Sequence, residues 1–289
     1  MADFVADTAV RRDEHDPELV HGSLTERWSV WGPNGGHLAA KALRAGLACS
    51  RFDRPASFQC HFLGVGAFAP IEIRVRAVGG GRRAESLHIE VHQGDRLLLT
   101  AVLWTVDEAL KGYDHAIHEA PAVPSPDELA PFHELADNYD EWFPIWRSME
   151  GRPVQWRDEP GEPISQTWLR FNDTSVEHRE ADAVRQLFWM DYPGWNATIS
   201  AHAWPFRFIA PNLDLTVQFH DFAPDADWML ADGVAPVACD GIVCAQSRIW
   251  TEDGRLVASG SSSHIFRPNP NYEQELAIAR EQGVAPPEA

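Results

Sequence analysis

The sequence predicts an α+β fold made of two similar halves, each with one apolar helix followed by four antiparallel strands. Apolar and polar residues alternate strictly over 71–77 and again over 87–92, which is the period-two pattern of half-buried strands. Leucine and alanine dominate 38–45 nearly all round, so we expect this helix to be buried. The same order of elements occurs twice along the chain, which predicts an internal duplication.

The first half begins with the stretch WGPNGGHLAAKALRAG at 31–46, a glycine-rich turn that leads into the apolar helix. GGGRR and GD are turns between successive alternating segments, as expected for antiparallel strands that are adjacent in sequence. The strands predicted for this half are 56–63, 71–78, 85–93 and 96–106.

The second half repeats this order after a polar, proline-rich segment. From Phe62 to Arg96 is 34 residues and from Phe219 to Arg255 is 36, so equivalent strands keep their spacing. We predict an N-terminal unit over 1–110, a connector over 111–163 and a C-terminal unit over 164–289. The elements predicted for the second half are helices at 179–192 and 195–206, and strands at 165–172, 212–222, 227–237, 240–251 and 255–266.

Composition excludes several classes of partner. The chain has 289 residues, 44% of them hydrophobic, and a net charge of −19, so it is globular and has no basic stripe for nucleic acid or an anionic membrane. No apolar run resembles a signal peptide or a membrane span, so a cytoplasmic location is expected. The four cysteines have neither disulfide nor zinc spacing and are interpreted as buried thiols: Cys49, Cys60, Cys239 and Cys244.

The glycine-rich turn has two interpretations. Gly35 and Gly36 are compatible with a simple turn and helix start, or with close packing of the helix on the sheet. They would also let a ligand approach bare backbone, because unpaired N–H groups at a helix N-terminus stabilise negative charge. His37, in the first turn, could bond a ligand or simply be a helix-start residue.

Four stretches together resemble the acyl-CoA thioesterase II (TesB-type) branch of the thioesterase superfamily, over nearly the whole chain. They are GPNGGHLAAKALRA, RPASFQCHFLGVGAFAPIEIRVRAVGGGRRAESLHIEVHQGDRLLLTAVLWT, NLDLTVQFHDFAPDADWMLAD and SRIWTEDGRLVASGSSSHIFR. The resemblance implies a double hot-dog fold, in which each long antiparallel sheet wraps a buried helix. It also implies hydrolysis of an acyl-CoA thioester, without a metal or an organic cofactor.

In that family an Asp, a Thr or Ser, and a Gln jointly hold the attacking water, and no covalent nucleophile is used. The family's Asp corresponds to Asp214, which strand-entry capping would also explain. A carboxylate there could take a proton from water, while the Gly36 amide would face the developing oxyanion. The resemblance thus implies catalytic roles for Asp214, Ser262 and Gly36, with Gly35, His37, Thr216 and His264 as substrate-binding candidates.

The sequence departs from the family pattern at two of the three water-holding positions. The hydroxyl residue falls near Ala235–Pro236–Val237, where no side chain carries a hydroxyl, and the Gln falls at Ser262, which has a shorter reach. A double hot-dog protein that binds an acyl or aromatic ligand without hydrolysing it is therefore a second hypothesis. An assembly module with a vestigial pocket is a third.

Other chemistries lack their motifs. The chain has no G-x-S-x-G elbow, no P-loop and no dinucleotide-binding glycine pattern, and GGGRR needs no phosphate because it is a hairpin turn. Asp191, in WMDYPGW, is interpreted as a turn or cap residue rather than a catalyst. Because open sheet edges tend to be paired or covered, a homodimer is a further expectation.

Overall fold

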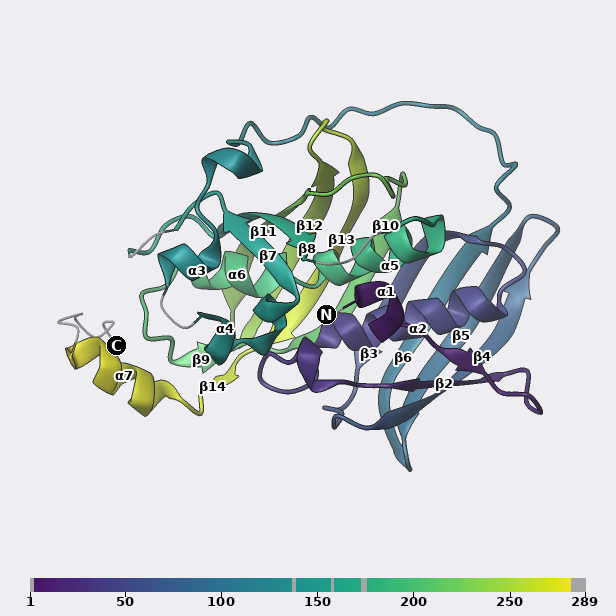
Figure 1. The fold of residues 1–289 in the computed structure, drawn as a ribbon, viewed down its shortest axis with the longest axis horizontal. Coiled ribbons are helices and arrows are strands. Elements are labelled where there is room, and N and C mark those ends of the chain that lie inside the picture. The colour runs from purple at the N-terminus through teal and green to yellow at the C-terminus, as the bar shows by residue number, and fades with distance from the viewer. Residues whose placement is uncertain (1–2, 137–138, 157–158, 173–175, 282–289) are drawn as a thin grey trace.

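The computed structural model describes residues 3–136, 139–156, 159–172 and 176–281 (Figure 1). Its first half contains the predicted helix and four long strands, preceded by a short helix and two short strands that the sequence did not predict. The elements are α1 (Phe4–Asp7), β1 (Arg11–Arg12), β2 (Leu19–Ser23), η1 (Glu26–Trp28), α2 (Gly35–Cys49), β3 (Arg54–Phe62), β4 (Pro70–Gly80), β5 (Ala84–Gln93) and β6 (Arg96–Val106).

The second half repeats this arrangement, and part of the predicted connector joins it. The segment before it forms η2 (Pro126–Glu128), α3 (Phe132–Leu135), α4 (Tyr139–Trp142), η3 (Pro144–Arg147) and β7 (Met149–Pro153). The C-terminal elements are β8 (Ile164–Phe171), α5 (Arg179–Met190), α6 (Pro193–Ile199), β9 (Phe208–Ile209), β10 (Asn212–Phe219), β11 (Met229–Cys239), β12 (Ile242–Thr251), β13 (Leu256–Ile265), β14 (Arg267–Pro268) and α7 (Tyr272–Glu281).

Both halves share a 12-stranded antiparallel sheet in the order β1-β2-β4-β5-β6-β3-β10-β13-β12-β11-β8-β7. The two halves meet where β3 pairs with β10, and the order outward from this pair is equivalent on both sides. The shift of 157 residues that carries Phe62 onto Phe219 also carries Gln59 onto Thr216, the residues paired at the middle of the β3–β10 register. The sheet therefore has an approximate two-fold axis, as an internal duplication requires.

Bulges confirm the same correspondence. The β10–β13 ladder shifts between Asn212 and Asp214, and the β3–β6 ladder shifts between Pro55 and Ser57. The 157-residue shift carries Pro55 onto Asn212 and Ser57 onto Asp214. A bulge kept at equivalent places in two repeats is a feature of the fold rather than a local defect.

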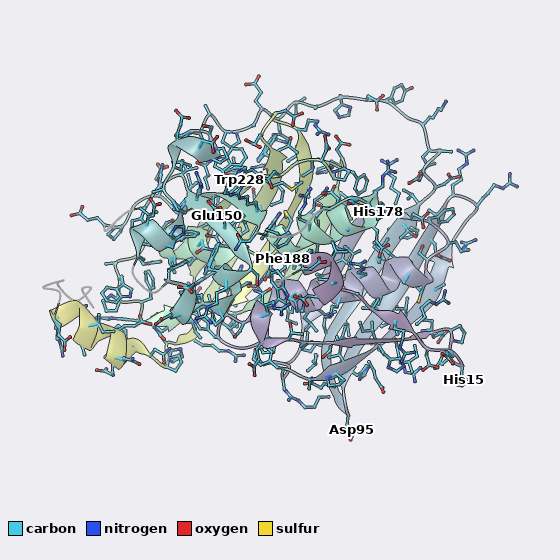
Figure 2. The ribbon with its side chains drawn as sticks, in the orientation of Figure 1. His15, Asp95, Glu150, His178, Phe188 and Trp228 are labelled. Carbon is cyan, nitrogen blue, oxygen red and sulfur yellow. The ribbon has the colours of Figure 1, made fainter. Side chains whose placement is uncertain are left out.

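Helices α2 and α5 pack against each other across the middle of this sheet (Figure 1). The small side chains of α2 allow the close approach, since Ala39, Ala40 and Ala42 are completely buried. An aromatic cluster fills the adjoining space: Phe4 stacks on Phe171 with ring centroids 4.2 Å apart. Phe188, near the centre of Figure 2, lies 5.1 Å from Phe4. The core is thus continuous between the halves.

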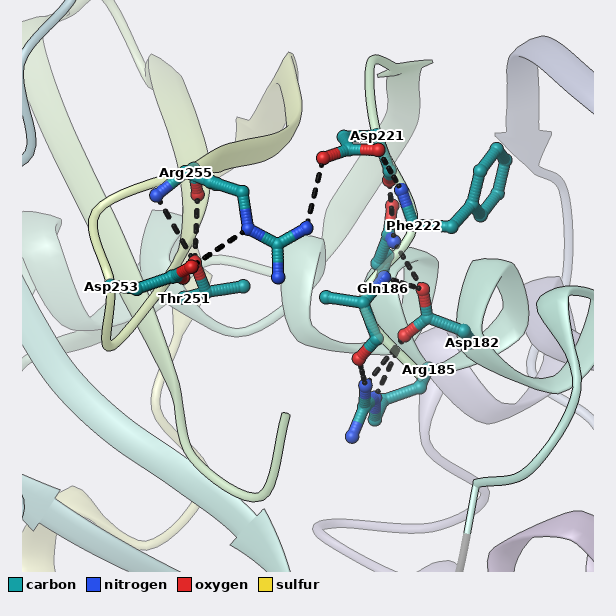
Figure 3. Close-up of polar contacts among 9 residues, drawn as sticks. Asp182, Arg185, Gln186, Asp221, Phe222, Thr251, Asp253 and Arg255 are labelled. Atoms are coloured by element: carbon teal, nitrogen blue, oxygen red, sulfur yellow. Dashed lines mark hydrogen bonds and ion pairs between the residues drawn. The ribbon is translucent and has the colours of Figure 1, made fainter. Parts of the chain in front are cut away.

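A buried polar network fixes α5 to the loop after β10 (Figure 3). The Asp182 carboxylate accepts hydrogen bonds from the Arg185 guanidinium at 2.6 Å, the Gln186 amide at 2.8 Å and the Ala223 N–H at 2.8 Å. The Asp182 side chain has no exposed surface. Removing it would leave the Arg185 charge buried without a countercharge, so the network sets the position of α5 firmly.

The structure corrects one prediction about cysteine. All four cysteines are free thiols, as expected, but only Cys60 is fully buried, whereas Cys239 and Cys244 are exposed. The reason is position: Cys239 ends β11 beside a tight turn, and Cys244 lies on the outward-facing side of β12. Among the described residues, no helix is both long and apolar enough to cross a membrane.

Candidate functional site

The first N–H groups of α2 donate hydrogen bonds to two side chains, one from the preceding turn and one from the other half of the chain. Asn34 caps the helix, since its side-chain oxygen accepts a hydrogen bond from the His37 N–H at 2.8 Å. The Gly36 N–H donates to the Asp191 Oδ2 at 2.7 Å, across the boundary between the halves. A Cβ at Gly36 would lie 2.9 Å from both the Cβ and the Oδ2 of Asp191. Glycine at 36 is therefore required by the close approach of an acidic side chain.

Asp191 connects three elements at this point. It follows the last residue of α5, and its Oδ1 accepts a hydrogen bond at 2.7 Å from the Asn212 side-chain amide at the start of β10. Burial raises the pKa of Asp191 to about 6, against the opposing effects of the Gly36 N–H and the Asn34 side chain. The residue is nevertheless partly exposed. We call Gly35, Gly36, Asp191 and Asn212 the seam site.

A second polar pair lies next to the seam site, because Asn212 pairs with His264 across the β10–β13 ladder. The His264 Nδ1 is 3.1 Å from the Ala210 carbonyl oxygen, and its Nε2 is 2.9 Å from the Ser262 Oγ. A carbonyl only accepts, so Nδ1 carries the proton and Nε2 accepts the Ser262 O–H. Burial lowers the pKa of His264, which is consistent with this neutral form. Gly194 of α6 covers both side chains.

Asp214 and Thr216 do not point toward α2. Leu215 and Val217, which alternate with them on β10, are completely buried against the helices, so strand alternation places Asp214 and Thr216 on the opposite face of the sheet. Asp214 is partly exposed, and its Oδ1 accepts the Ser263 N–H at 3.0 Å. The acidic side chain at the Gly36 amide is therefore Asp191.

His37 lies inside the core rather than in an open site. Its ring stacks on Trp28 with centroids 5.6 Å apart, and 1% of its surface is exposed. Burial, with the nearby Lys41 charge, lowers the pKa of His37 to about 3, so the ring is neutral. The Lys41 ammonium group donates to the Asp7 carbonyl oxygen at 2.6 Å, which ties the N-terminal segment to α2.

The positions expected to supply a family hydroxyl line a separate small pocket. Ala235 and Pro236, together with Thr198 and His202 near α6, line a pocket of about 160 Å³. The Thr198 hydroxyl, the one hydroxyl among these four, donates to the Gly194 carbonyl oxygen at 2.9 Å. In the described part of the chain, no three His, Cys, Asp or Glu side chains are grouped so that they could hold a metal ion.

The structure thus brings Gly35 and Gly36 together with Asp191 and Asn212, and places Ser262 and His264 beside them. Sequence reasoning named neither Asp191 nor Asn212 as a site residue. One signal was present: α2 begins with two glycines and has no acidic residue in its first turn, so its N–H groups lack a local anion. The partner lies 155 residues further along the chain, which the pattern could not reveal.

Comparison with known proteins agrees with this architecture. Residues 24–106 match the family model for the acyl-CoA thioesterase N-terminal domain, and residues 116–262 match that for the acyl-CoA thioesterase C-terminal domain. None of the curated proteins matches the chain.

Solved structures share the fold at low sequence identity. A conserved protein with a hot dog fold from Alicyclobacillus acidocaldarius is 19% identical with a TM-score of 0.78, covering 92% of this chain and 98% of its own. The acyl-CoA thioesterase II TesB2 from Mycobacterium marinum is 20% identical with a TM-score of 0.74, and the match covers 93% of this chain and 100% of that protein's chain. The tesB protein of Mycobacterium avium subs paratuberculosis is 20% identical with a TM-score of 0.73, and the match covers 92% of this chain and 98% of that protein's chain. With both halves matched by its domain models, the chain belongs to the acyl-CoA thioesterase family and has a double hot-dog fold.

Proposed function

We propose that the protein hydrolyses acyl thioesters of the acyl-CoA class, releasing a carboxylic acid and a free thiol. The observation that carries this proposal is the seam site, where a partly exposed acid from one half lies against the glycine-led start of α2 in the other. Membership of the thioesterase family supports the substrate class. A carboxylate and helix N–H groups are the two elements that water attack on a carbonyl needs.

In the proposed reaction, the oxygen of a water molecule attacks the thioester carbonyl carbon, and the carbon–sulfur bond then breaks. The sulfur leaves with a proton, so the products are the acid and the thiol. The resemblance assigns the water to Asp214 and Ser262 and the oxyanion to Gly36, whereas Asp214 lies on the opposite face of the sheet and the Gly36 N–H is bonded to Asp191. Since the Ser262 proton is donated to His264, Ser262 would receive a hydrogen bond from water rather than donate one.

The direct test is release of free thiol from purified protein incubated with acyl-CoA esters of increasing chain length. We expect turnover with at least one ester. Asp232→Asn is a suitable control, because Asp232 is a partly buried carboxylate on β11 that accepts a hydrogen bond from the Gln166 amide at 3.0 Å. This variant should hydrolyse the same ester at the parent rate. Absence of turnover across the whole series would contradict the proposal.

Ligand binding without hydrolysis is the second candidate. The observation that favours it is the absence of a hydroxyl side chain at 235–237, where the family's water-holding residue is expected. A rise in melting temperature with acyl-CoA, unaccompanied by any free thiol, would support this alternative. Binding together with thiol release would support hydrolysis.

A further inference from the structure

Asp191 is the carboxylate that the fold brings to the start of α2, and its two oxygens are held separately. The Gly36 N–H bonds Oδ2 and the Asn212 amide bonds Oδ1, each at 2.7 Å. We propose that Asp191 is the catalytic base of the hydrolysis, and that Gly36 and Asn212 are its positioning residues. This inference rests on the proposed thioester hydrolysis.

The hydrogen bonds of Asp191 orient the carboxylate without saturating it. An ionised carboxylate has about four lone-pair positions; the two donors named above occupy one on each oxygen, and the Asn34 side chain, which also lowers the pKa, can occupy a third. A remaining lone pair can therefore accept a proton from water held in a fixed direction. Asp182 shows the contrast: four donor atoms from Arg185, Gln186 and Ala223 surround it, and its side chain is completely buried.

A hydrogen-bond donor for the substrate carbonyl lies beside this carboxylate. The Gly35 N–H has no hydrogen-bond partner within the part of the chain that the structure describes, and Gly35 is partly exposed. A Cβ built at Gly35 would lie 3.7 Å from the Asp191 Oδ2, an ordinary van der Waals distance, so Gly35 and the carboxylate are neighbours. At the first turn of a 15-residue helix, this N–H also benefits from the helix dipole.

The reaction then balances within the seam site. Asp191 takes one proton from water as the water oxygen bonds to the thioester carbonyl carbon, and the Gly35 N–H stabilises the resulting oxyanion. Collapse of this tetrahedral species breaks the carbon–sulfur bond. The proton on Asp191 passes to the departing sulfur, which restores the carboxylate and yields acid and thiol.

The protonation state of Asp191 suits this role. With its pKa raised by burial to about 6, the group is largely ionised at neutral pH, yet it is a stronger base than an ordinary aspartate. The titratable side chains around it include Tyr192, the next residue, Cys60 of β3, whose pKa is raised by burial and by Asp191, and His264 of β13, which is neutral. Asp214 on β10 carries a charge near Cys60 and His264.

The decisive experiment is the pH dependence of kcat/KM for an ester that the parent protein hydrolyses. The parent rate should fall below about pH 6. Asp191→Asn should lower kcat by about 100-fold or more, the typical contribution of a general base, and should lose this acid limb. Its unfolding midpoint should not be lower than that of the parent, which separates loss of the base from loss of structure.

Asn212→Asp tests the role of Asp191 through the pH at which the rate falls, which would not change if Asp191 were only structural. It places a second carboxylate against Asp191, and a like charge raises the pKa of a carboxyl group. We expect the acid limb to shift upward by about one pH unit or more, and an unmoved limb would overturn the inference.

The outcomes separate the inference from the proposed function. A parent protein without activity on any ester refutes both. An active parent with an equally active Asp191→Asn variant refutes the role of Asp191 alone. If Asp214→Asn abolishes turnover and Asp191→Asn does not, the base is on the other face of the sheet.

Discussion

Replacing each of the two glycines at the start of α2 by alanine tests the packing of the seam site. A Cβ at Gly36 would meet the Asp191 side chain at 2.9 Å, whereas a Cβ at Gly35 would meet ring atoms of Phe62 at 3.4 Å, an ordinary contact. Gly36→Ala should therefore displace Asp191 and break a hydrogen bond to a charged group, worth about 1.5–3 kcal/mol. The better helix propensity of alanine offsets up to about 1 kcal/mol of this.

We expect Gly36→Ala to lower the free energy of unfolding by about 1–2 kcal/mol, and Gly35→Ala to leave it unchanged or raise it by up to about 1 kcal/mol. Urea denaturation followed by circular dichroism measures both. In an Asp191→Gly background both the Cβ and the carboxylate that obstruct a Cβ at residue 36 are gone, so most of the penalty for Gly36→Ala should disappear. Equal stabilities for the two alanine variants, or a penalty that persists without Asp191, would refute the reasoning.

Three further predictions concern charge and packing. Because the folded-state pKa of Asp191 is raised to about 6 from 3.8, ionising it costs stability as pH rises; the stability of Asp191→Asn relative to the parent should grow by roughly 2 kcal/mol between pH 4 and 7 in urea titrations. Asp182→Asn should lower the unfolding free energy by about 3 kcal/mol or more, since it leaves the Arg185 charge uncompensated, while the exposed Asp221→Asn should change it by less than about 1 kcal/mol. Phe4→Ala should cost about 3–5 kcal/mol, measured by thermal and urea unfolding, as Phe4 fills the aromatic cluster.

The fold could be predicted because its signals are local and occur twice. Alternation over 71–77 and 87–92 is decided by neighbouring residues, and both segments lie in the observed strands β4 and β5. The edge strands β1 and β2 were missed because they are short and have no clear period: β1 is two residues and β2 is five. The strand conformation of β2 comes from pairing with β4, far along the chain, and β1 in turn pairs with β2.

The site was predicted only in part, because its contacts join distant segments. The glycine-rich turn indicated that a ligand could bring negative charge to the N-terminus of α2, and the structure places an acid of the protein itself there. Asp191 does cap α5, as its sequence context suggested, since its N–H donates to the Phe188 carbonyl oxygen. The same residue uses its side chain for Gly36, and no local pattern distinguishes a capping acid from one that also reaches another helix.

The approximate two-fold axis gives the chain two equivalent helix junctions, and only one of them has the residues of the seam site. The 157-residue shift relates Asn212 to Pro55, which has no side-chain donor, so the equivalent end cannot hold a carboxylate as the seam site does. At that end, α5 begins with Arg179 and Glu180 rather than glycines, and the Arg44 guanidinium pairs with Glu180 at 3.2 Å. Duplication therefore supplied two matching helix junctions, of which one sets an acid against the first N–H groups of a helix and the other carries an ion pair.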